Sequence, residues 1–417
     1  MSGEHKIRPD WKLSVAVVMA LALLAGFLWW ELKSSTLVAR VPVATAPSDS
    51  PSLTHGPLAS TISASKPSAR LAAATGAEIC GIGRLPPSVD PADINNYVEA
   101  KTRAARDRWE AALLNSADLH ARAVGLLLQS GGERVSRESA VKAAEARDEL
   151  VQLAAGGNDP VVYSLALGVC RAHRSTMSAV VAADTDVVTL SQGEEGSGDT
   201  SSSTAAANSD ITASLGACTR LSLSQWARLD PDNAAPWLAM AQVARDTGDA
   251  TSEAADLDHA AQAQKMENSG KLMLSLARSE MPQDLSPLEK SAAAIDFIGH
   301  EAASAGPFGE LTRYCTVSAI QQAHVRTQCD ALATLLVDHG LTLLEFSIGQ
   351  RLGARVGWSQ ERLGELSRER MALAKLIPDE GSNPWSCETV SRENAFFEKR
   401  MELGEMQALR YFEQKPP

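Results

Sequence analysis

The middle of the chain, from Trp226 to Ala261, alternates helix-forming stretches with residues that break helices. The segment 230–233 (DPDN) predicts a break, because proline cannot continue the helix before it and Asx residues can cap the helix after it. The stretch 234–245 then places small and apolar residues on one stripe of a helix, and Gly248 with Asp249 predicts a short turn. The stretch 250–263 continues as a second alanine-rich helix. The sequence therefore predicts a helical hairpin.

This hairpin resembles the tetratricopeptide repeat, whose first helix carries the pattern W-x2-L-G-x2-Y. The residues that match the pattern or would pack the repeat are Trp226, Pro231, Trp237 (aromatic position), Met240 (leucine), Ala241 (small), Ala244 (tyrosine) and Gly248. The chain departs from the family at Glu253, where alanine is usual, and at Lys265, where the closing proline stands. The resemblance covers residues 215–264 and implies stacked helical hairpins with a concave binding surface.

Helical periodicity also fills most of the chain from Pro91 to Phe412, interrupted by glycine, proline or Asn-Ser breaks. Predicted helices cover 91–129 (broken near 115–116), 136–155, 160–172, 215–229, 269–278, 292–303, 308–319, 327–337, 341–352, 360–377 and 389–412. Ser286–Glu289 forms a capping-box pattern in front of one of them. No stretch alternates like a strand, and aromatic residues are only 5%, so we expect an all-α fold. Core candidates in the first helices are Trp109, Leu113, Leu114, Leu119, Val124, Leu127, Leu128, Val141, Ala144, Leu150, Val151 and Leu153.

An uncharged run of 18 residues, Leu13–Trp30, approaches the length needed to cross a bilayer. Lys6, Arg8 and Lys12 precede it, so residues 1–12 should stay in the cytoplasm and the remainder be exported. A cleaved signal peptide is the alternative, but its apolar core is usually shorter. We therefore expect a single-pass protein of the inner membrane with a periplasmic domain.

Two segments lack the apolar residues that would offset the entropy of ordering them. Residues 31–77 are rich in Ser, Ala, Thr and Pro, and residues 176–214 in Gly, Ser, Thr and acids. The first is predicted to be a disordered tether, and the second a disordered insertion in an exported helical domain, 78–417. An S-x-x-K match at 63–66 is explained by chance in a serine-rich stretch.

The six cysteines are scattered, without the C-x-x-C pair typical of zinc or redox sites. An even number behind an export segment favours disulfides over buried free thiols. Cys170 and Cys218 would meet if the helices 160–172 and 215–229 pack antiparallel. Cys315 and Cys329 flank a possible turn at 321–324, and Cys80 with Cys387 would join the two ends of the folded region. Fifteen pairings exist for six cysteines, so this one is a hypothesis.

No catalytic, cofactor-binding or metal-binding residues are predicted. A net charge of −12 disfavours nucleic acid as a partner, and the histidines lack metal-ligand spacing. Glu345, among apolar neighbours, is the one carboxylate that would suit a lysozyme-like glycosidase, although an ion-paired or helix-edge role is favoured. The series Arg351, Arg355, Arg362, Arg368 and Arg370 is interleaved with acids, as on a solvated helix face.

Three functions remain open. The favoured one is a membrane-anchored scaffold that binds a protein or peptide partner in the cell envelope, since helical repeat arrays present such surfaces. The alternatives are a helical cell-wall enzyme of the glycosidase type, and a structural accessory subunit of a membrane complex.

Overall fold

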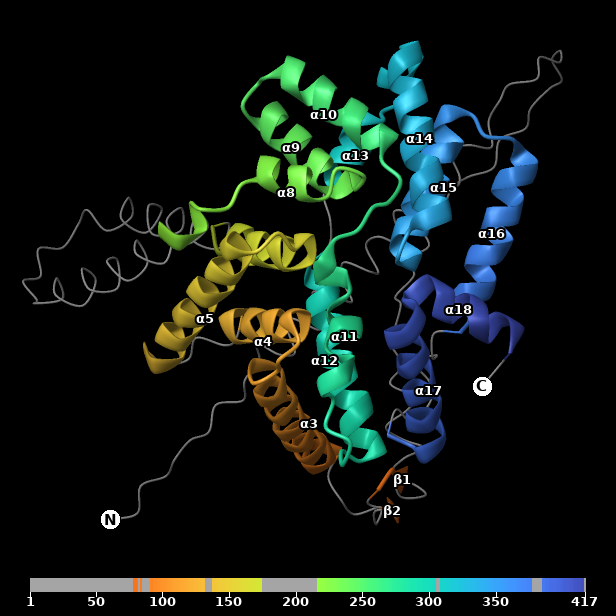
Figure 1. Ribbon diagram of the computed structural model, residues 1–417. Coiled ribbons are helices and arrows are strands. Elements are labelled where there is room, and N and C mark those ends of the chain that lie inside the picture. Colours follow the sequence, from red (N-terminus) through yellow and green to blue (C-terminus); the bar gives the residue numbers. More distant parts are fainter. Residues whose placement is uncertain are drawn as a thin grey trace, which may run out of the picture. The chain divides into compact units, whose positions relative to one another are not determined.

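A computed structural model describes residues 78–81, 83–84, 91–131, 137–174, 216–304, 308–376 and 385–415 (Figure 1). Leu13–Trp30, the tether 31–77 and the insertion 176–214 lie outside these residues. Within the described part, no helix combines the length and the apolar character needed to cross a membrane.

The described residues are almost entirely helical, which confirms the all-α prediction. The helices are, in chain order, α3 (Pro91–Leu114), α4 (Leu119–Gly131), α5 (Arg137–Gly156), 160–174, 216–218, α8 (Leu223–Leu229), α9 (Ala234–Asp246), α10 (Ala250–Gln262), η1 (Ser269–Lys271), α11 (Met273–Leu276), η2 (Arg278–Glu280), α12 (Pro287–Ala303), α13 (Phe308–Tyr314), η3 (Ala319–Gln321), α14 (Ala323–His339), α15 (Leu343–Val356), α16 (Gln360–Ala374), α17 (Cys387–Leu403) and α18 (Glu405–Gln414). One antiparallel ladder joins β1 (Glu78–Ile79) to β2 (Gly83–Arg84).

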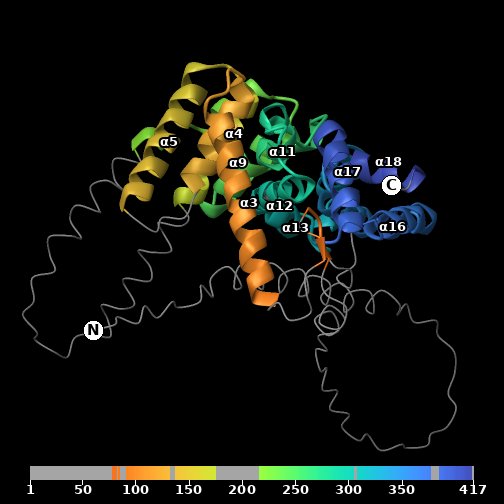
Figure 2. The ribbon, with the colours of Figure 1, turned by 90° about the horizontal axis from the view of Figure 1, so that it is seen from below.

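Many helices pack on the helix that follows them in the chain, as in α4 with α5, α9 with α10, and α14 with α15. Figures 1 and 2 both show α12 lying between α3 and α17, so it joins the first helices to the last. Side-chain caps begin many of these helices. The predicted capping box is present, because Ser286 and Glu289 exchange hydrogen bonds across the first turn of α12.

Two large clusters of buried side chains hold the helices together. The first joins α3, α4, α5, the helix 160–174, α11, α12 and α17. At its centre, the rings of Trp109 and Phe297 lie 4.3 Å apart, and the indole nitrogen of Trp109 donates to the Ala277 carbonyl at 3.0 Å. The second joins α9, α10, α13, α14 and α15. There, Gly349 allows α15 close to α14, because a β-carbon at this position would lie 2.8 Å from that of Leu336.

The predicted core is partly wrong in the first helices. Leu119 and Val141 are more than 40% exposed, at 41% and 43%, whereas Trp109, Leu113, Val124, Leu150 and Val151 are fully buried. Leu119 is the first residue of α4 and Val141 lies on the face of α5 opposite the core. Helical period alone does not tell which of two partly apolar faces another helix will cover.

Several predicted helices are not continuous in the structure. The segment 215–229 is interrupted at 219–222, where Tyr163 accepts a hydrogen bond from the Ser222 amide at 2.9 Å and Ser222 caps α8. The predicted helix 389–412 is divided into α17 and α18. The first of these ends at Leu403, because Gly404 adopts a positive φ of 80° that turns the chain into α18. The segment 269–278 is not one helix but a run of short turns, η1, α11 and η2.

The sequence-predicted hairpin 234–263 is present as α9 and α10, with Asn233 and Asp249 as N-caps and Gly248 in the turn at φ 77°. The predicted stripe is confirmed in part, because Ala241 and Ala244 are buried. Trp237 and Met240 are only half-buried, whereas Ala234 and Leu238 face the core. Trp237 instead packs at the edge of this core, where its ring stacks on His259 at 4.3 Å and donates to the Pro231 carbonyl at 3.1 Å.

The structure pairs the same cysteines as the sequence argument did: Cys80 with Cys387, Cys170 with Cys218, and Cys315 with Cys329. The Cα atoms of the three pairs lie 4.5, 5.6 and 5.9 Å apart, as disulfides require. The described residues contain no free cysteine.

Candidate functional site

A groove of about 540 Å³ lies where η2, α12, α17 and α18 meet. Its apolar part consists of Met281, Ala294, Phe397, Met401 and Phe412. Four of these side chains are buried or nearly so, which makes them a floor, while Met281 is half-exposed at the edge. Polar and charged side chains surround this floor. The combination of an apolar floor and a polar rim is typical of a binding site.

Three features of the chain position the groove. The capping box at Ser286 fixes the start of α12. Ser291 on α12 donates to Glu393 on α17 at 2.6 Å, and the Asn394 amide donates to the Pro287 carbonyl at 2.8 Å, so these contacts fix α17 against α12. The reversal at Gly404 then directs α18 back, which brings Tyr411 and Phe412 to the groove.

The rim carries five charged side chains: Arg278, Lys290, Lys399, Glu398 and Glu402. Lys399 and Glu402 form an ion pair at 2.7 Å on α17. This pair raises the pKa of Lys399 and lowers that of Glu402. Arg278 and Lys290 have no carboxylate partner within salt-bridge distance in the described part of the chain. The rim therefore holds two cations that are available to a ligand.

Beneath the groove, Arg400 joins a buried carboxylate, that of Glu301, to a half-buried one, that of Glu405. Its guanidinium donates to Glu301 of α12 at 2.8 Å and pairs with Glu405 of α18 at 2.9 Å. Each carboxylate also accepts a backbone N–H, from Leu274 at 2.8 Å and from Leu343 at 3.0 Å respectively. The cluster thus connects α17 to the amino ends of α11 and α15.

Burial raises the pKa of Glu301 to about 7, against the lowering effect of Arg400 and of the Leu274 amide. Glu301 is 5% exposed, and removing a carboxylate from water strongly disfavours its charged form. The nearby charge of Glu405 acts in the same direction as burial. Glu301 is therefore a buried group that titrates near neutral pH.

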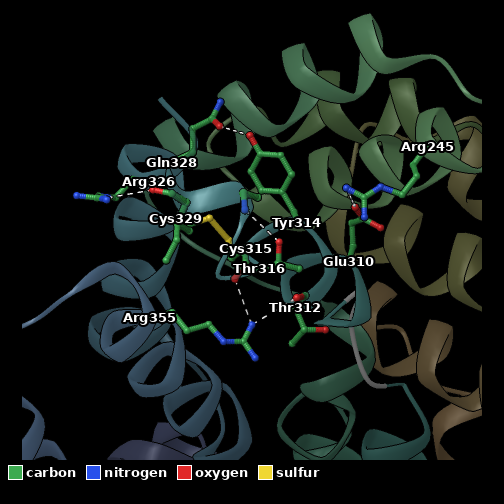
Figure 3. Close-up of a disulfide and its surroundings, with 12 residues drawn as sticks. Arg245, Glu310, Thr312, Tyr314, Cys315, Thr316, Arg326, Gln328, Cys329 and Arg355 are labelled. Atoms are coloured by element: carbon green, nitrogen blue, oxygen red, sulfur yellow. Dashed lines mark hydrogen bonds and ion pairs between the residues drawn. A yellow bond between two sulfur atoms is a disulfide. The ribbon is translucent and has the colours of Figure 1, made fainter. Parts of the chain in front are cut away.

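The Cys315–Cys329 disulfide lies in a second polar cluster, between α13 and α14 (Figure 3). Arg355 of α15 donates to the Cys315 carbonyl at 3.2 Å. The Tyr314 hydroxyl donates to Gln328, whose amide donates to Asp258 of α10. Burial raises the pKa of Tyr314 to about 12. Both sulfurs belong to fully buried residues, so this cluster has a structural role and offers no accessible reactive group.

Glu345 is ion-paired, as the favoured interpretation of the sequence has it. It is fully buried, and one carboxylate oxygen accepts from the Lys271 ammonium. The other oxygen accepts the backbone amides of Leu341 and Thr342 at 2.6 and 3.0 Å, in a capping box at the start of α15. Since no face of this carboxylate is open, it does not fit the role of a general acid for a polysaccharide.

Comparisons with protein-family models, with curated proteins and with solved structures found no match for this chain. In the described part of the chain, no group of His, Cys, Asp or Glu side chains is arranged to hold a metal ion. The candidate site therefore depends on the geometry of the groove alone.

The sequence predicted the helix 389–412, which carries Phe397 and Met401. It did not predict that these side chains form the floor of a groove, because that depends on which helices pack beside them. The rim residues Arg278, Lys290 and Tyr411 gave no signal, because they lie far apart in the sequence and only the packing of α12, α17 and α18 brings them together.

Proposed function

We propose that this protein is a membrane-anchored helical scaffold that binds a protein or peptide partner on the periplasmic side of the inner membrane. The observation that carries the proposal is the groove at α12, α17 and α18, which combines an apolar floor with unpaired cations. Grooves between helices with apolar anchors and a polar rim are a recurring mode of peptide recognition.

The cellular location is part of the same proposal. Three cysteine pairs at disulfide distance favour an oxidising compartment. The uncharged run Leu13–Trp30, with basic residues before it, supports an anchor whose following domain is exported. The tether 31–77 would let that domain reach a partner tens of ångströms from the bilayer, at about 5–6 Å times the square root of its length.

We also propose that the domain is built from repeat-like helical hairpins. The pair α9 and α10, with Gly248 in its turn, supports a relationship to the tetratricopeptide hairpin. In this proposal the hairpin is one unit of a stacked array that stiffens the domain, while the groove binds the partner.

The test is site-specific photo-crosslinking in intact cells. A benzoyl-phenylalanine replaces Gln283, an exposed residue at the groove, and in a control protein it replaces Val317, which is 68% exposed and outside the groove. We expect one discrete protein adduct from Gln283 and none from Val317. Equal adducts from both positions, or none from Gln283, would count against a partner at this groove.

The same experiment separates the alternatives. A partner that co-purifies in fixed stoichiometry without crosslinking would indicate a structural accessory subunit. Absence of any adduct, together with release of muropeptides from purified cell walls by the protein, would favour the glycosidase.

A further inference from the structure

The groove is locally basic in a strongly acidic protein. Arg278, Lys290 and Lys399 line it, and Lys415 stands 5.6 Å from the centre of the Tyr411 ring. These four cations face two lining carboxylates, one of which is already paired with Lys399. The whole chain, by contrast, carries a net charge of −12. A cationic site in an acidic molecule is a local arrangement and not a consequence of composition.

The apolar floor further restricts the class of ligand that fits the groove. Phe397, Met401 and Phe412 form it, with Met281 at the edge and Tyr411 beside it. Methionine and aromatic side chains adapt to inserted apolar groups and are enriched at the centres of protein interfaces. A volume of about 540 Å³ accommodates one or two large side chains, but not a folded domain.

We infer that the groove binds an acidic peptide segment of a partner protein, with an apolar or aromatic side chain on the floor and a carboxylate at Arg278 and Lys290. Both cations are free to form charge-assisted hydrogen bonds, which are stronger than neutral ones. A basic peptide would meet like charges at the same positions, and rejection of that kind contributes to specificity. This inference rests on the proposed function and specifies the chemistry of its partner.

The affinity must come from these local contacts. The net negative charge of the chain repels an acidic partner at long range, and salt screens that repulsion over about a Debye length of 10 Å. We therefore expect moderate salt to speed association of the partner, whereas the contact with Lys290 should be less affected by salt because this residue is half-buried.

The test measures fluorescence anisotropy of labelled synthetic peptides with the full chain in mild detergent. The first peptide is amphipathic, with several glutamates and one phenylalanine; a second replaces the glutamates by lysines, and a third replaces the phenylalanine by serine. We expect the first to bind more tightly than both others. Lys290→Glu should weaken its binding about tenfold or more, and Arg278→Glu similarly, since each removes a charge-assisted contact.

Lys142→Glu is the matched control. Lys142 lies on α5, outside the groove, and its replacement changes the net charge by the same amount. Lys290 is in the first turns of α12, where a glutamate is favourable to the helix, so Lys290→Glu should fold, as circular dichroism can verify. Equal weakening by Lys142→Glu, or tighter binding of the lysine peptide, would overturn the inference, as would failure of the acidic peptide to bind.

Crosslinking at Gln283 in cells reports on the proposed function separately. An adduct at Gln283, together with no preference for the acidic peptide, would support the scaffold proposal and refute the inference that its ligand is acidic. If neither an adduct nor peptide binding is found, both the scaffold proposal and the inference are refuted.

Discussion

Replacing Glu301 by glutamine should remove a pH dependence from the stability of the fold. The carboxyl group is buried between Arg400 and the Leu274 amide, and burial raises its pKa from an ordinary 4.5 to about 7. Glutamine has nearly the same shape and cannot ionise, and, like the protonated carboxyl group, it keeps one carbonyl oxygen as an acceptor while its NH2 group replaces the second oxygen. It therefore imitates the protonated state that this site favours.

Proton linkage predicts that the free energy of unfolding falls as pH rises through the titration of Glu301. Because the folded protein holds this proton more tightly than the unfolded chain does, the stabilisation is complete below the unfolded pKa and is lost as pH rises through about 7. The difference between 4.5 and about 7 corresponds to about 3 kcal/mol. From about pH 5 to about pH 8, the wild type should thus lose about that much free energy of unfolding relative to Glu301→Gln.

Guanidinium denaturation of the disulfide-intact protein, followed by far-UV circular dichroism at several pH values, measures this difference. Glu138→Gln is the control: Glu138 is exposed on α5, and its pair with Lys142 lowers its pKa, so its titration lies below the tested range. A difference between wild type and Glu301→Gln that stays constant with pH would refute the burial argument. A wild type that gains stability as pH rises would show that the attraction of Arg400 outweighs burial.

Two further predictions concern the α14–α15 core and the buried ion pair. Gly349→Ala should destabilise the fold by about 1–3 kcal/mol because its β-carbon would crowd α14. Gly364→Ala on α16 should stabilise the fold by up to about 1 kcal/mol, because its β-carbon would meet only the Arg368 guanidinium, at an ordinary contact distance of 3.6 Å. Thermal denaturation compares the two variants, and equal effects would contradict the packing argument. Lys271→Met should lower the free energy of unfolding by about 3–5 kcal/mol, because it leaves the Glu345 charge buried without its partner. The double variant Lys271→Met with Glu345→Gln should recover part of that loss in denaturant titrations. If it recovers nothing, the broken ion pair is not the cause of the destabilisation.

The sequence determined the features that depend on a few neighbouring residues. Asn233 and Ser286 cap their helices as predicted, because a cap needs only a side chain and an amide two or three residues away. The Cys170–Cys218 pair was predictable for a related reason. These cysteines meet if the two predicted helices, 160–172 and 215–229, pack antiparallel, and the structure pairs the same two residues.

Only the tertiary structure decided the groove and the charges beneath it. Arg400 and Glu301 are 99 residues apart in the sequence, and neither position differs in local pattern from the exposed charges around it. Trp237 shows the same limit, because its place at the edge of a core depends on where α10 and His259 lie. Caps and periodicity are short-range properties of the backbone, whereas burial and charge pairing depend on which helix faces meet.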